Sequence, residues 1–396
     1  MRAMVLDRRL DEAAVLASFT GACDNLVTRR RTRSTGRTVP AMPRLMEGIM
    51  RAAVFVEPGT VRVEDRPEPV IRKSTDVIVR VTDACVCGSD LWWFRGISHR
   101  EHGSLTGHEA MGVVTETGPA VSSLAPGDFV IVPFTHGCGA CPVCLAGFDA
   151  NCPNAEPGGN AGYQAEYMRA YNADGALVKV PGVPGDYSAA MRASLLTLSD
   201  VMATGYHAAR MAEVGPGATA VVLGDGAVGL LGVLSARMLG AERIIAMSRH
   251  EDRQRIAREF GASDIVPERG ADAVTRVMEL TGGVGADAVL ECVGTNQSTQ
   301  TAIAVARPGS VIGRVGVPHD VDIDSLGLFW RNIGLRGGPA SVTTYDRQIL
   351  LEAVLDGSID PGRVFTAEFD LDDVQEAYAA MDERRAVKSL LHVCAD

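Results

Sequence analysis

Four cysteines lie close together before the middle of the chain, with the spacing C-x2-C-x2-C-x7-C. Their thiolates would share one short loop, which suits a zinc ion with a closed tetrahedral shell that stabilises the fold and does no chemistry. An iron–sulfur cluster or disulfides are alternatives, because bacterial ferredoxins also begin C-x2-C-x2-C. We interpret the run as a structural zinc site formed by Cys138, Cys141, Cys144 and Cys152.

A glycine-rich loop follows the apolar segment 220–223 and precedes a helical pattern; it reads Gly224-Asp225-Gly226-Ala227-Val228-Gly229. In a G-x-G-x-x-G loop the first glycine permits the turn and the second lets a pyrophosphate approach the backbone. The third lets helix and strand pack closely. The helix N-terminus then presents free N–H groups and its positive dipole end to the phosphates. This order of strand, loop and helix predicts a dinucleotide-binding site.

The end of the next strand indicates which dinucleotide binds. An NAD site usually has an acidic residue there, which accepts hydrogen bonds from the ribose hydroxyls. Ser248 occupies this position, and Arg249 and Arg253 follow it, where either could contact a 2′-phosphate. A solvated helix start is the alternative, because Glu251 and Asp252 lie close by. We therefore predict NADP as the cofactor, with NAD as the alternative.

The elements that must position these residues follow two different sequence patterns. From Met50 to about Leu195, short β-branched segments such as 51–56 and 77–81 are separated by glycine-containing turns, which predicts a mainly antiparallel, loop-rich β domain. After Ser199, apolar strands alternate with helices, which predicts a parallel, doubly wound α/β sheet. The expected strands are 219–223, 244–247, 288–292, 310–315 and 333–336, and the expected helices end at Leu239 and Phe260. A helix over 371–381 and a strand over 389–393 are expected near the C-terminus.

Length and composition limit the class of protein. A chain of 396 residues suggests two domains with additions, and residues 1–48, with their arginine cluster and no apolar period, predict a flexible extension. A net charge of −11 argues against nucleic acid as a partner, and no apolar run is long enough to span a membrane. The nine cysteines and the absence of a secretory signal favour a reducing, cytoplasmic location.

A second set of metal-ligand residue types is dispersed along the chain. Cys87 lies in a Cys-Gly-Ser-Asp segment, and His108 and Glu109 follow Gly107. Asp200 lies near the boundary between the predicted β domain and the predicted α/β domain. One thiolate, one imidazole and one carboxylate would leave an open position on zinc for a water or a substrate oxygen, as a catalytic site requires. Spacing alone does not single these residues out.

From about Met50 to the C-terminus, the sequence resembles the zinc-containing medium-chain dehydrogenase/reductase family. The features that carry the resemblance are the Cys-Gly-Ser-Asp turn, the Gly-His-Glu motif, the four-cysteine loop, the Gly-Asp-Gly-Ala-Val-Gly loop and their order. The resemblance implies a GroES-like catalytic domain over 49–196 and 347–396, and a Rossmann domain over 197–346. It also implies substrate binding in the cleft between them and a homodimer or homotetramer.

The resemblance also implies roles for single residues. Cys87 and His108 match two ligands of a catalytic zinc, and Asp200 matches the third ligand of the branch that uses Asp. Glu109 would be a nearby or exchangeable ligand, and Ser89 matches the hydroxyl that bonds the substrate oxygen and starts a proton relay. Lys388 resembles a position that contacts the pyrophosphate.

The sequence departs from the family at one position. Several members have a histidine five residues after the cysteine ligand to continue the proton relay, and this chain has Trp92 there. Proton exit would then use water, His102 or another route. Trp92, Trp93 and Phe94 either line an aromatic substrate pocket or belong to the core.

Together these features predict a dehydrogenase with two zinc ions per subunit. It would transfer a hydride between a small alcohol, or the corresponding aldehyde or ketone, and NADP or NAD. A zinc-free reductase of quinones or enones from the same superfamily, and a zinc-stabilised binding protein, are the alternatives.

Overall fold

The computed structural model describes residues 48–156 and 162–395. The predicted N-terminal extension therefore lies outside the described residues, apart from its last residue. Among the described residues, no helix is both long and apolar enough to cross a membrane.

A six-stranded parallel sheet occupies the second half of the chain, in the order β10-β9-β8-β11-β12-β13. This is the 3-2-1-4-5-6 order of a dinucleotide-binding doubly wound fold. Its strands read as continuous apolar runs because helices cover both faces. The strands are β8 (Thr219–Leu223), β9 (Arg243–Met247), β10 (Asp264–Val266), β11 (Ala286–Glu291), β12 (Ala306–Arg314) and β13 (Gly334–Gly337).

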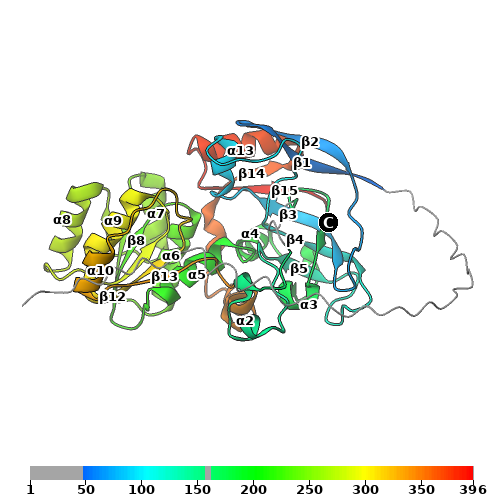
Figure 1. The fold of residues 1–396 in the computed structure, drawn as a ribbon. Coiled ribbons are helices and arrows are strands. Elements are labelled where there is room, and N and C mark those ends of the chain that lie inside the picture. The colour runs from blue at the N-terminus through cyan, green and yellow to red at the C-terminus, as the bar shows by residue number, and fades with distance from the viewer. Residues whose placement is uncertain (1–47, 157–161, 396) are drawn as a thin grey trace, which may run out of the picture. The chain divides into compact units, whose positions relative to one another are not determined.

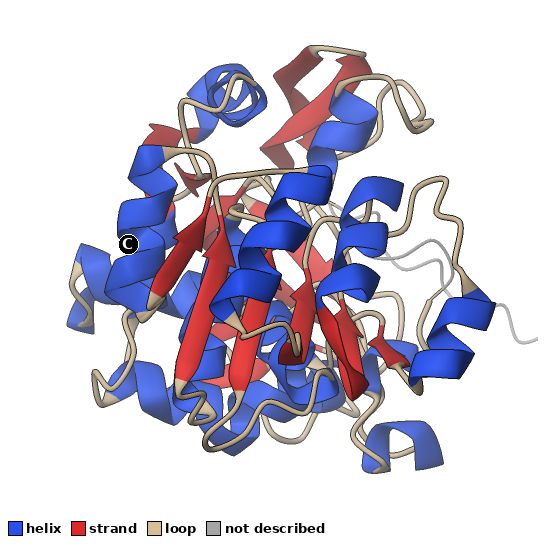
Figure 2. Ribbon diagram, turned by 90° about the vertical axis from the view of Figure 1, so that its left-hand side faces the viewer, coloured by secondary structure: helices blue, strands red, loops and turns tan. Residues whose placement is uncertain are grey.

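Alternate residues of the central strands enter two separate cores. Val222 packs with α5 and α6 on one face, whereas Val221 packs on the face that α8 and α9 cover. Figure 1 shows α5 and α6 on one side of this sheet and α8, α9 and α10 on the other, and Figure 2 shows its strands side by side. The helices are α5 (Val201–Met211), α6 (Ala227–Met238), α7 (Glu251–Phe260), α8 (Gly270–Leu280), α9 (Asn296–Val305) and α10 (Ser325–Arg331).

The second sheet is mainly antiparallel and is built from two distant parts of the chain. Its order is β14-β15-β3-β4-β5-β7, with β6 also paired to β3, and only β14 and β15 run parallel. A separate antiparallel pair, β1 (Ile49–Glu57) and β2 (Thr60–Pro67), precedes it. The remaining strands are β3 (Val77–Cys85), β4 (Ala110–Thr117), β5 (Phe129–Val132), β6 (Tyr167–Ala170), β7 (Val178–Val180), β14 (Phe365–Asp370) and β15 (Lys388–His392).

Short helices complete this half of the molecule. They are α1 (Asp90–Phe94), α2 (Pro142–Leu145), α3 (Ala173–Ala176), α4 (Ala189–Thr197), α11 (Val342–Tyr345), α12 (Leu351–Leu355) and α13 (Val374–Asp382). A π-helical turn, Asp346–Leu350, joins α11 to α12. The predicted α/β class, with a mainly β part and a parallel doubly wound part, is confirmed; the exact domain boundaries stay a prediction.

Candidate metal and cofactor site

One large cavity, of about 1110 Å³, is lined by both halves of the fold. The β half contributes Cys87, Ser89 and His108, and the parallel sheet contributes the glycine loop that follows β8. Cys87, His108 and Asp200 therefore face the same cavity as the dinucleotide loop, whereas Glu109 is not among the residues that line it.

Strand pairing explains why Cys87 and His108 meet. β3 and β4 are antiparallel, and Ala84 pairs with Ala110 at the end of the ladder. Residues that follow β3 therefore lie beside residues that precede β4. Asp200 joins them from the residue before α5, and its Oδ2 lies 3.7 Å from Cys87 Sγ and 3.6 Å from His108 Nε2.

The spacing of these ligand atoms fits a zinc ion. One ligand atom from each of Cys87, His108, Glu109 and Asp200 lies within 4.8 Å of the others. Zinc bonds of about 2.0–2.3 Å in a tetrahedron separate neighbouring ligand atoms by roughly 3.3–3.8 Å. Glu109 Oε2 is buried without a hydrogen-bond partner, so this oxygen is available to bind a metal ion.

Neighbouring groups orient the candidate ligands and make the site negative. Asp90 Oδ1 lies 3.4 Å from His108 Nδ1, Asp90 Oδ2 accepts a bond from the Cys87 backbone N–H, and Asp200 Oδ1 accepts one from the Thr204 hydroxyl at 2.6 Å. Burial alone would lower the pKa of His108, but the neighbouring Asp90, Cys87 and Asp200 raise it well above its usual value. A buried site with this excess of anionic groups favours a dication. Asp90 therefore contacts a candidate ligand, and its Oδ1 also accepts a hydrogen bond from Trp93 Nε1 at 3.3 Å.

Lys388 is buried beneath this site. Its Nζ lies 2.7 Å from Glu109 Oε1 and donates a bond to the Val86 carbonyl at 3.1 Å, and both charged side chains are at most 1% exposed. Strand β15 places Lys388 beside Glu109 because β15 pairs with the end of β3, where Leu390 lies opposite Cys85. Lys388 also lines the cavity, so the predicted pyrophosphate contact stays a prediction.

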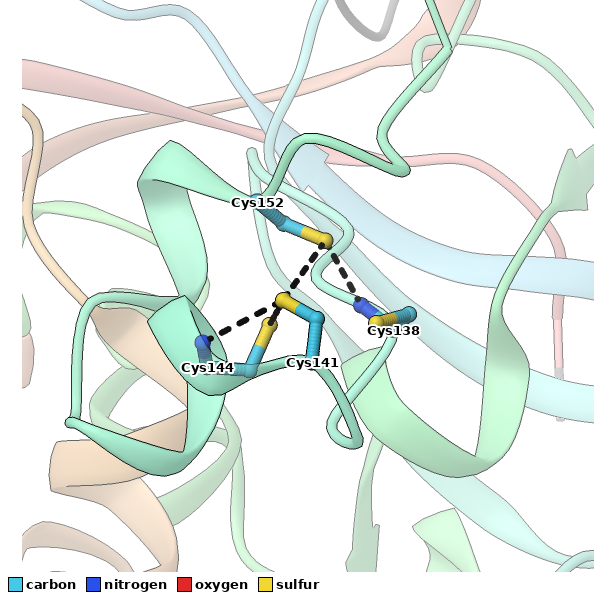
Figure 3. Close-up of side chains that lie close together, drawn as sticks. All are labelled: Cys138, Cys141, Cys144 and Cys152. Atoms are coloured by element: carbon cyan, nitrogen blue, oxygen red, sulfur yellow. Dashed lines mark hydrogen bonds between the residues drawn. The ribbon is translucent and has the colours of Figure 1, made fainter.

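The four-cysteine loop folds around a single point (Figure 3). Cys141 Sγ lies 3.5 Å from Cys144 Sγ and 3.9 Å from Cys152 Sγ, close to the roughly 3.8 Å expected between thiolates on a tetrahedral zinc. All four are free thiols, so disulfides do not join them. Backbone N–H groups of Cys138 and Asn154 point at Cys152 Sγ, as expected for thiolate sulfur. Burial, together with the neighbouring Cys141 and Cys152, raises the pKa of Cys144 to about 12, whereas, against burial, hydrogen bonds from Asn154 and the backbone lower the pKa of Cys138 to about 6.

The glycine loop has the backbone that dinucleotide binding requires. Gly224 has a φ of +114°, a region that other residues rarely adopt, and a Cβ on Gly229 would lie 2.1 Å from the Gly224 carbonyl oxygen. Gly226 is the residue before α6, and open space surrounds its Cα on the side where a Cβ would lie. The Asp225 side chain turns away to Ser248, whose hydroxyl donates to Asp225 Oδ2 at 2.9 Å.

The part of the cavity beside Asp225 is basic. Arg249 and Arg253 both line the cavity, and Arg253 also forms an ion pair with Asp225 at 3.4 Å. Among the other arginines of the cavity lining, Arg269 lies before α8 and Arg384 after α13. Nothing in the local sequence marks them, because they come from other elements.

The structure separates the aromatic residues of α1. Trp93 and Phe94 belong to the core, whereas Trp92 lines the cavity. His102 is exposed, bonds the Val56 carbonyl and is absent from the cavity lining, so it lies outside the proton route considered from the sequence. His207, which is buried and contacts the Tyr345 hydroxyl, is a core histidine.

Known proteins resemble the chain over both halves. Residues 73–182 match the family model "Alcohol dehydrogenase GroES-like domain", and residues 227–345 match "Zinc-binding dehydrogenase". A zinc-type alcohol dehydrogenase B from Aspergillus flavus is 37% identical over 77% of this chain and 72% of its own length. A probable zinc-binding alcohol dehydrogenase from Mycobacterium tuberculosis is 34% identical over 85% of this chain and 86% of its own.

A solved structure gives the same result in three dimensions. The alcohol dehydrogenase TADH from Thermus sp. ATN1 superposes with a TM-score of 0.79 at 32% identity, and the match covers 87% of this chain and 100% of that chain. The GroES-like and Rossmann character predicted from the sequence is thereby confirmed.

Proposed function

This chain belongs to the zinc-dependent medium-chain dehydrogenase family, and we propose that it interconverts a small alcohol and its carbonyl compound with NADP as the hydride carrier. Its relatives are zinc-type alcohol dehydrogenases, so the protein is an oxidoreductase of that type, and the zinc-free reductase and the binding protein are set aside. The observation that carries the proposal is the convergence of Cys87, His108 and Asp200 beside the dinucleotide loop.

In the proposed mechanism, Cys87, His108 and Asp200 would hold a catalytic zinc, and Glu109 would be a nearby, exchangeable ligand. When bound, such a zinc acts as a Lewis acid on the substrate oxygen. Ser89, exposed in the same cavity, accepts the hydroxyl proton of the alcohol, and the carbon-bound hydrogen leaves as hydride to the nicotinamide. Cys138, Cys141, Cys144 and Cys152 would hold a second zinc with a structural role.

Two observations support NADP over NAD. Ser248, rather than a carboxylate, follows β9, and Arg249, Arg269 and Arg384 line the cavity. Burial and the nearby Arg249 and Arg384 lower the pKa of Arg269, and like charges gathered in a cleft favour an anionic ligand such as a 2′-phosphate. NAD remains the alternative, because the Asp225 carboxylate accepts a bond from the Ser248 hydroxyl at 2.9 Å and so lies near the position where an NAD site has its acidic residue.

The proposed substrate is a small apolar alcohol. Trp92, Phe134 and Leu91 line the cavity together with Cys87 and His108, which supports an apolar alcohol. We also propose a homodimer or homotetramer, as in the family, and a cytoplasmic location, since the proposed zinc thiolates need a reducing compartment.

The Asp200→Asn variant tests the catalytic site. The Asp200 side chain makes no capping bond to α5, so the helix should form without its charge. We expect zinc content to fall from about two per subunit toward one, and alcohol-dependent NADPH formation to be lost. Asp252→Asn, on the exposed surface of α7, is the matched control. An Asp200→Asn protein that keeps activity and both zinc ions contradicts the ligand assignment.

A second variant tests the cofactor. Arg249→Ala should lower kcat/KM for NADPH about 10- to 100-fold, the range of one lost charge-assisted bond, and leave kcat/KM for NADH within about twofold. Arg255→Ala on α7, outside the cavity lining, is the control. A wild-type preference for NADH would refute the NADP assignment.

A further inference from the structure

Two buried aspartates lie outside the sites described above. Asp149 begins the short helix η3 (Asp149–Asn151) inside the four-cysteine loop, and Asp346 begins the π-helical turn that follows α11. Asp149 is 3% exposed and Asp346 is 1% exposed, and no basic side chain of the described residues forms an ion pair with either. Carboxylates are seldom buried this deeply unless a charge or hydrogen bonds compensate them.

Helix α11 brings the two aspartates together. It packs against η3, and its Thr344 hydroxyl donates to Asp149 Oδ1 at 2.5 Å. Asp346 directly follows α11, and burial and then the charge of Asp149 raise the pKa of the Asp346 carboxyl. The two carboxyl groups therefore share one buried environment.

Four side-chain oxygens of this cluster have no hydrogen-bond partner within the described part of the chain. They are Asp149 Oδ2, both carboxylate oxygens of Asp346, and Ser341 Oγ. Ser341 is fully buried at the residue before α11; burial raises the pKa of Asp149, and the hydroxyls of Thr344 and Ser341 lower it, which places Ser341 beside that carboxylate. Buried polar groups are nearly always paired with protein, ordered water or an ion, so this group of unpaired oxygens indicates a ligand.

Arg347, the next residue along the π-helical turn, does not neutralise the pair. Its Nη2 donates to the backbone carbonyls of Asp174 and Leu177, at 2.9 and 2.6 Å. Burial and Asp149 keep the pKa of Asp346 raised against the effect of Arg347. When both aspartates are ionised, the cluster therefore has an excess of negative charge that a bound cation would neutralise.

A small ion can approach Asp346 from the surface. Asp346 borders a hollow of about 420 Å³ that side chains of α12 also line. The carboxylate oxygens themselves are buried, so the hollow leads toward the cluster without exposing it. An entry path and a set of oxygen ligands are both properties expected of a metal site.

We propose that Asp149, Asp346 and Ser341 bind one hard divalent cation, of the Ca²⁺ or Mg²⁺ class, where the four-cysteine loop meets the π-helical turn. Carboxylate and hydroxyl oxygens are the donors that such cations prefer, whereas zinc prefers sulfur and nitrogen. The two carboxylates balance the charge of the cation, and water completes its coordination shell. The cation holds the four-cysteine loop against the segment that follows the cavity-lining residues 335–340, and this role does not depend on the proposed dehydrogenase function.

The thermal test uses the zinc-loaded full chain in buffer freed of Ca²⁺ and Mg²⁺. Either cation, at about 100 times its dissociation constant, should raise the unfolding temperature of the wild type by about 3–6 °C, whereas NaCl at matched ionic strength should not. Asp346→Asn keeps the shape of the side chain and removes its charge, so it should unfold above the wild type without the cation and below it with the cation. Glu352→Gln, on the exposed surface of α12 beside the same hollow, is the matched control and should respond as the wild type does.

A readout that depends on neither unfolding nor activity comes from metal analysis after equilibrium dialysis. The wild type and Glu352→Gln should hold about one Ca²⁺ or Mg²⁺ per subunit in addition to zinc, and Asp346→Asn should hold none. Separate dialysis against CaCl₂ and MgCl₂ shows which of the two cations binds.

The other outcomes overturn the proposal. An unfolding temperature that acidification raises and neither cation changes indicates that the two aspartates share a proton. Equal responses of the wild type and Asp346→Asn place the cation elsewhere, and an extra zinc ion instead of Ca²⁺ or Mg²⁺ refutes the assigned class of cation. If Asp346→Asn does not fold, dialysis of the wild type still decides, because a chain that holds neither cation has no such site.

Discussion

Replacing Lys388 with methionine should destabilise the protein strongly. Methionine keeps the length of the side chain but removes the ammonium that lies 2.7 Å from Glu109 Oε1, in a place where both side chains are at most 1% exposed. The carboxylate would remain buried without its cation, and the Val86 carbonyl would lose a donor at 3.1 Å. Breaking one side of a buried ion pair costs about 3–5 kcal/mol of unfolding free energy.

The pKa shifts of Lys388 and Glu109 predict how the stability of Lys388→Met changes with pH. Burial raises the pKa of Glu109 although Lys388 opposes it, whereas the pKa of Lys388 is raised despite burial because Cys85, Glu109 and Cys87 surround it with negative charge. Lys388 therefore contributes stability at neutral pH that is lost only as the pH rises through its raised pKa. In Lys388→Met the pKa of Glu109 should rise further. As acidification protonates the Glu109 carboxyl, the variant should regain about 1.4 kcal/mol of unfolding free energy for each unit by which the pKa of Glu109 has risen.

The assay is a double-mutant cycle by urea unfolding at pH 8 and pH 5, with zinc content held equal. Glu109→Gln and the double variant complete the cycle, and the double variant should be more stable than Lys388→Met. The affinity for NADPH, measured on the same proteins, tests the predicted pyrophosphate contact separately. A Lys388→Met protein within about 1 kcal/mol of wild type would refute the argument that this pair stabilises the site.

Three further perturbations follow from the structure. Cys144→Ser should lower zinc content by one per subunit and make the 138–156 loop sensitive to proteolysis, which mass spectrometry of limited digests can detect; a loop as resistant as wild type would contradict a structural metal there. Gly229→Ala should weaken NADPH binding at least tenfold, because its Cβ would lie 2.1 Å from the Gly224 carbonyl oxygen, while Gly185→Ala, in open space, should bind as wild type. Burial and then Asp149 raise the pKa of Asp346, whose two oxygens have no partner, so wild-type stability should increase as the pH falls through that raised pKa toward about 4. Asp346→Leu should stabilise the protein by about 1–3 kcal/mol in thermal unfolding at pH 7, and a lower stability would reveal a partner for this carboxylate.

The sequence predicted most securely the elements whose signals are local. The strand over 219–223 has the predicted bounds, and α7 ends at Phe260 as predicted, because the glycine loop and Gly261 terminate these elements. Strand β10 and helix α8 were not assigned, since three strand residues and an amphipathic helix without a clear cap carry little local signal.

The site was predictable only in part. The cysteine loop followed from spacing, but Asp200 joined Cys87 and His108 through the family resemblance, since 113 residues separate Asp200 from Cys87. The Lys388–Glu109 pair and the Trp92–His319 stack depend on how β15 and the loop after β12 pack, and no periodicity in one sequence encodes such pairings.

The position of β15 also constrains how the protein can be made. Because this strand pairs with β3 and carries Lys388, the mainly antiparallel sheet stays incomplete until β15 leaves the ribosome, roughly 300 residues after β3, or about 15–60 s at common synthesis rates. The parallel sheet, contiguous from β8 to β13, can fold during that delay. A nascent chain would thus acquire its nucleotide pocket first and its neutralised metal site last, so unfinished chains could bind cofactor but would have no assembled catalytic centre.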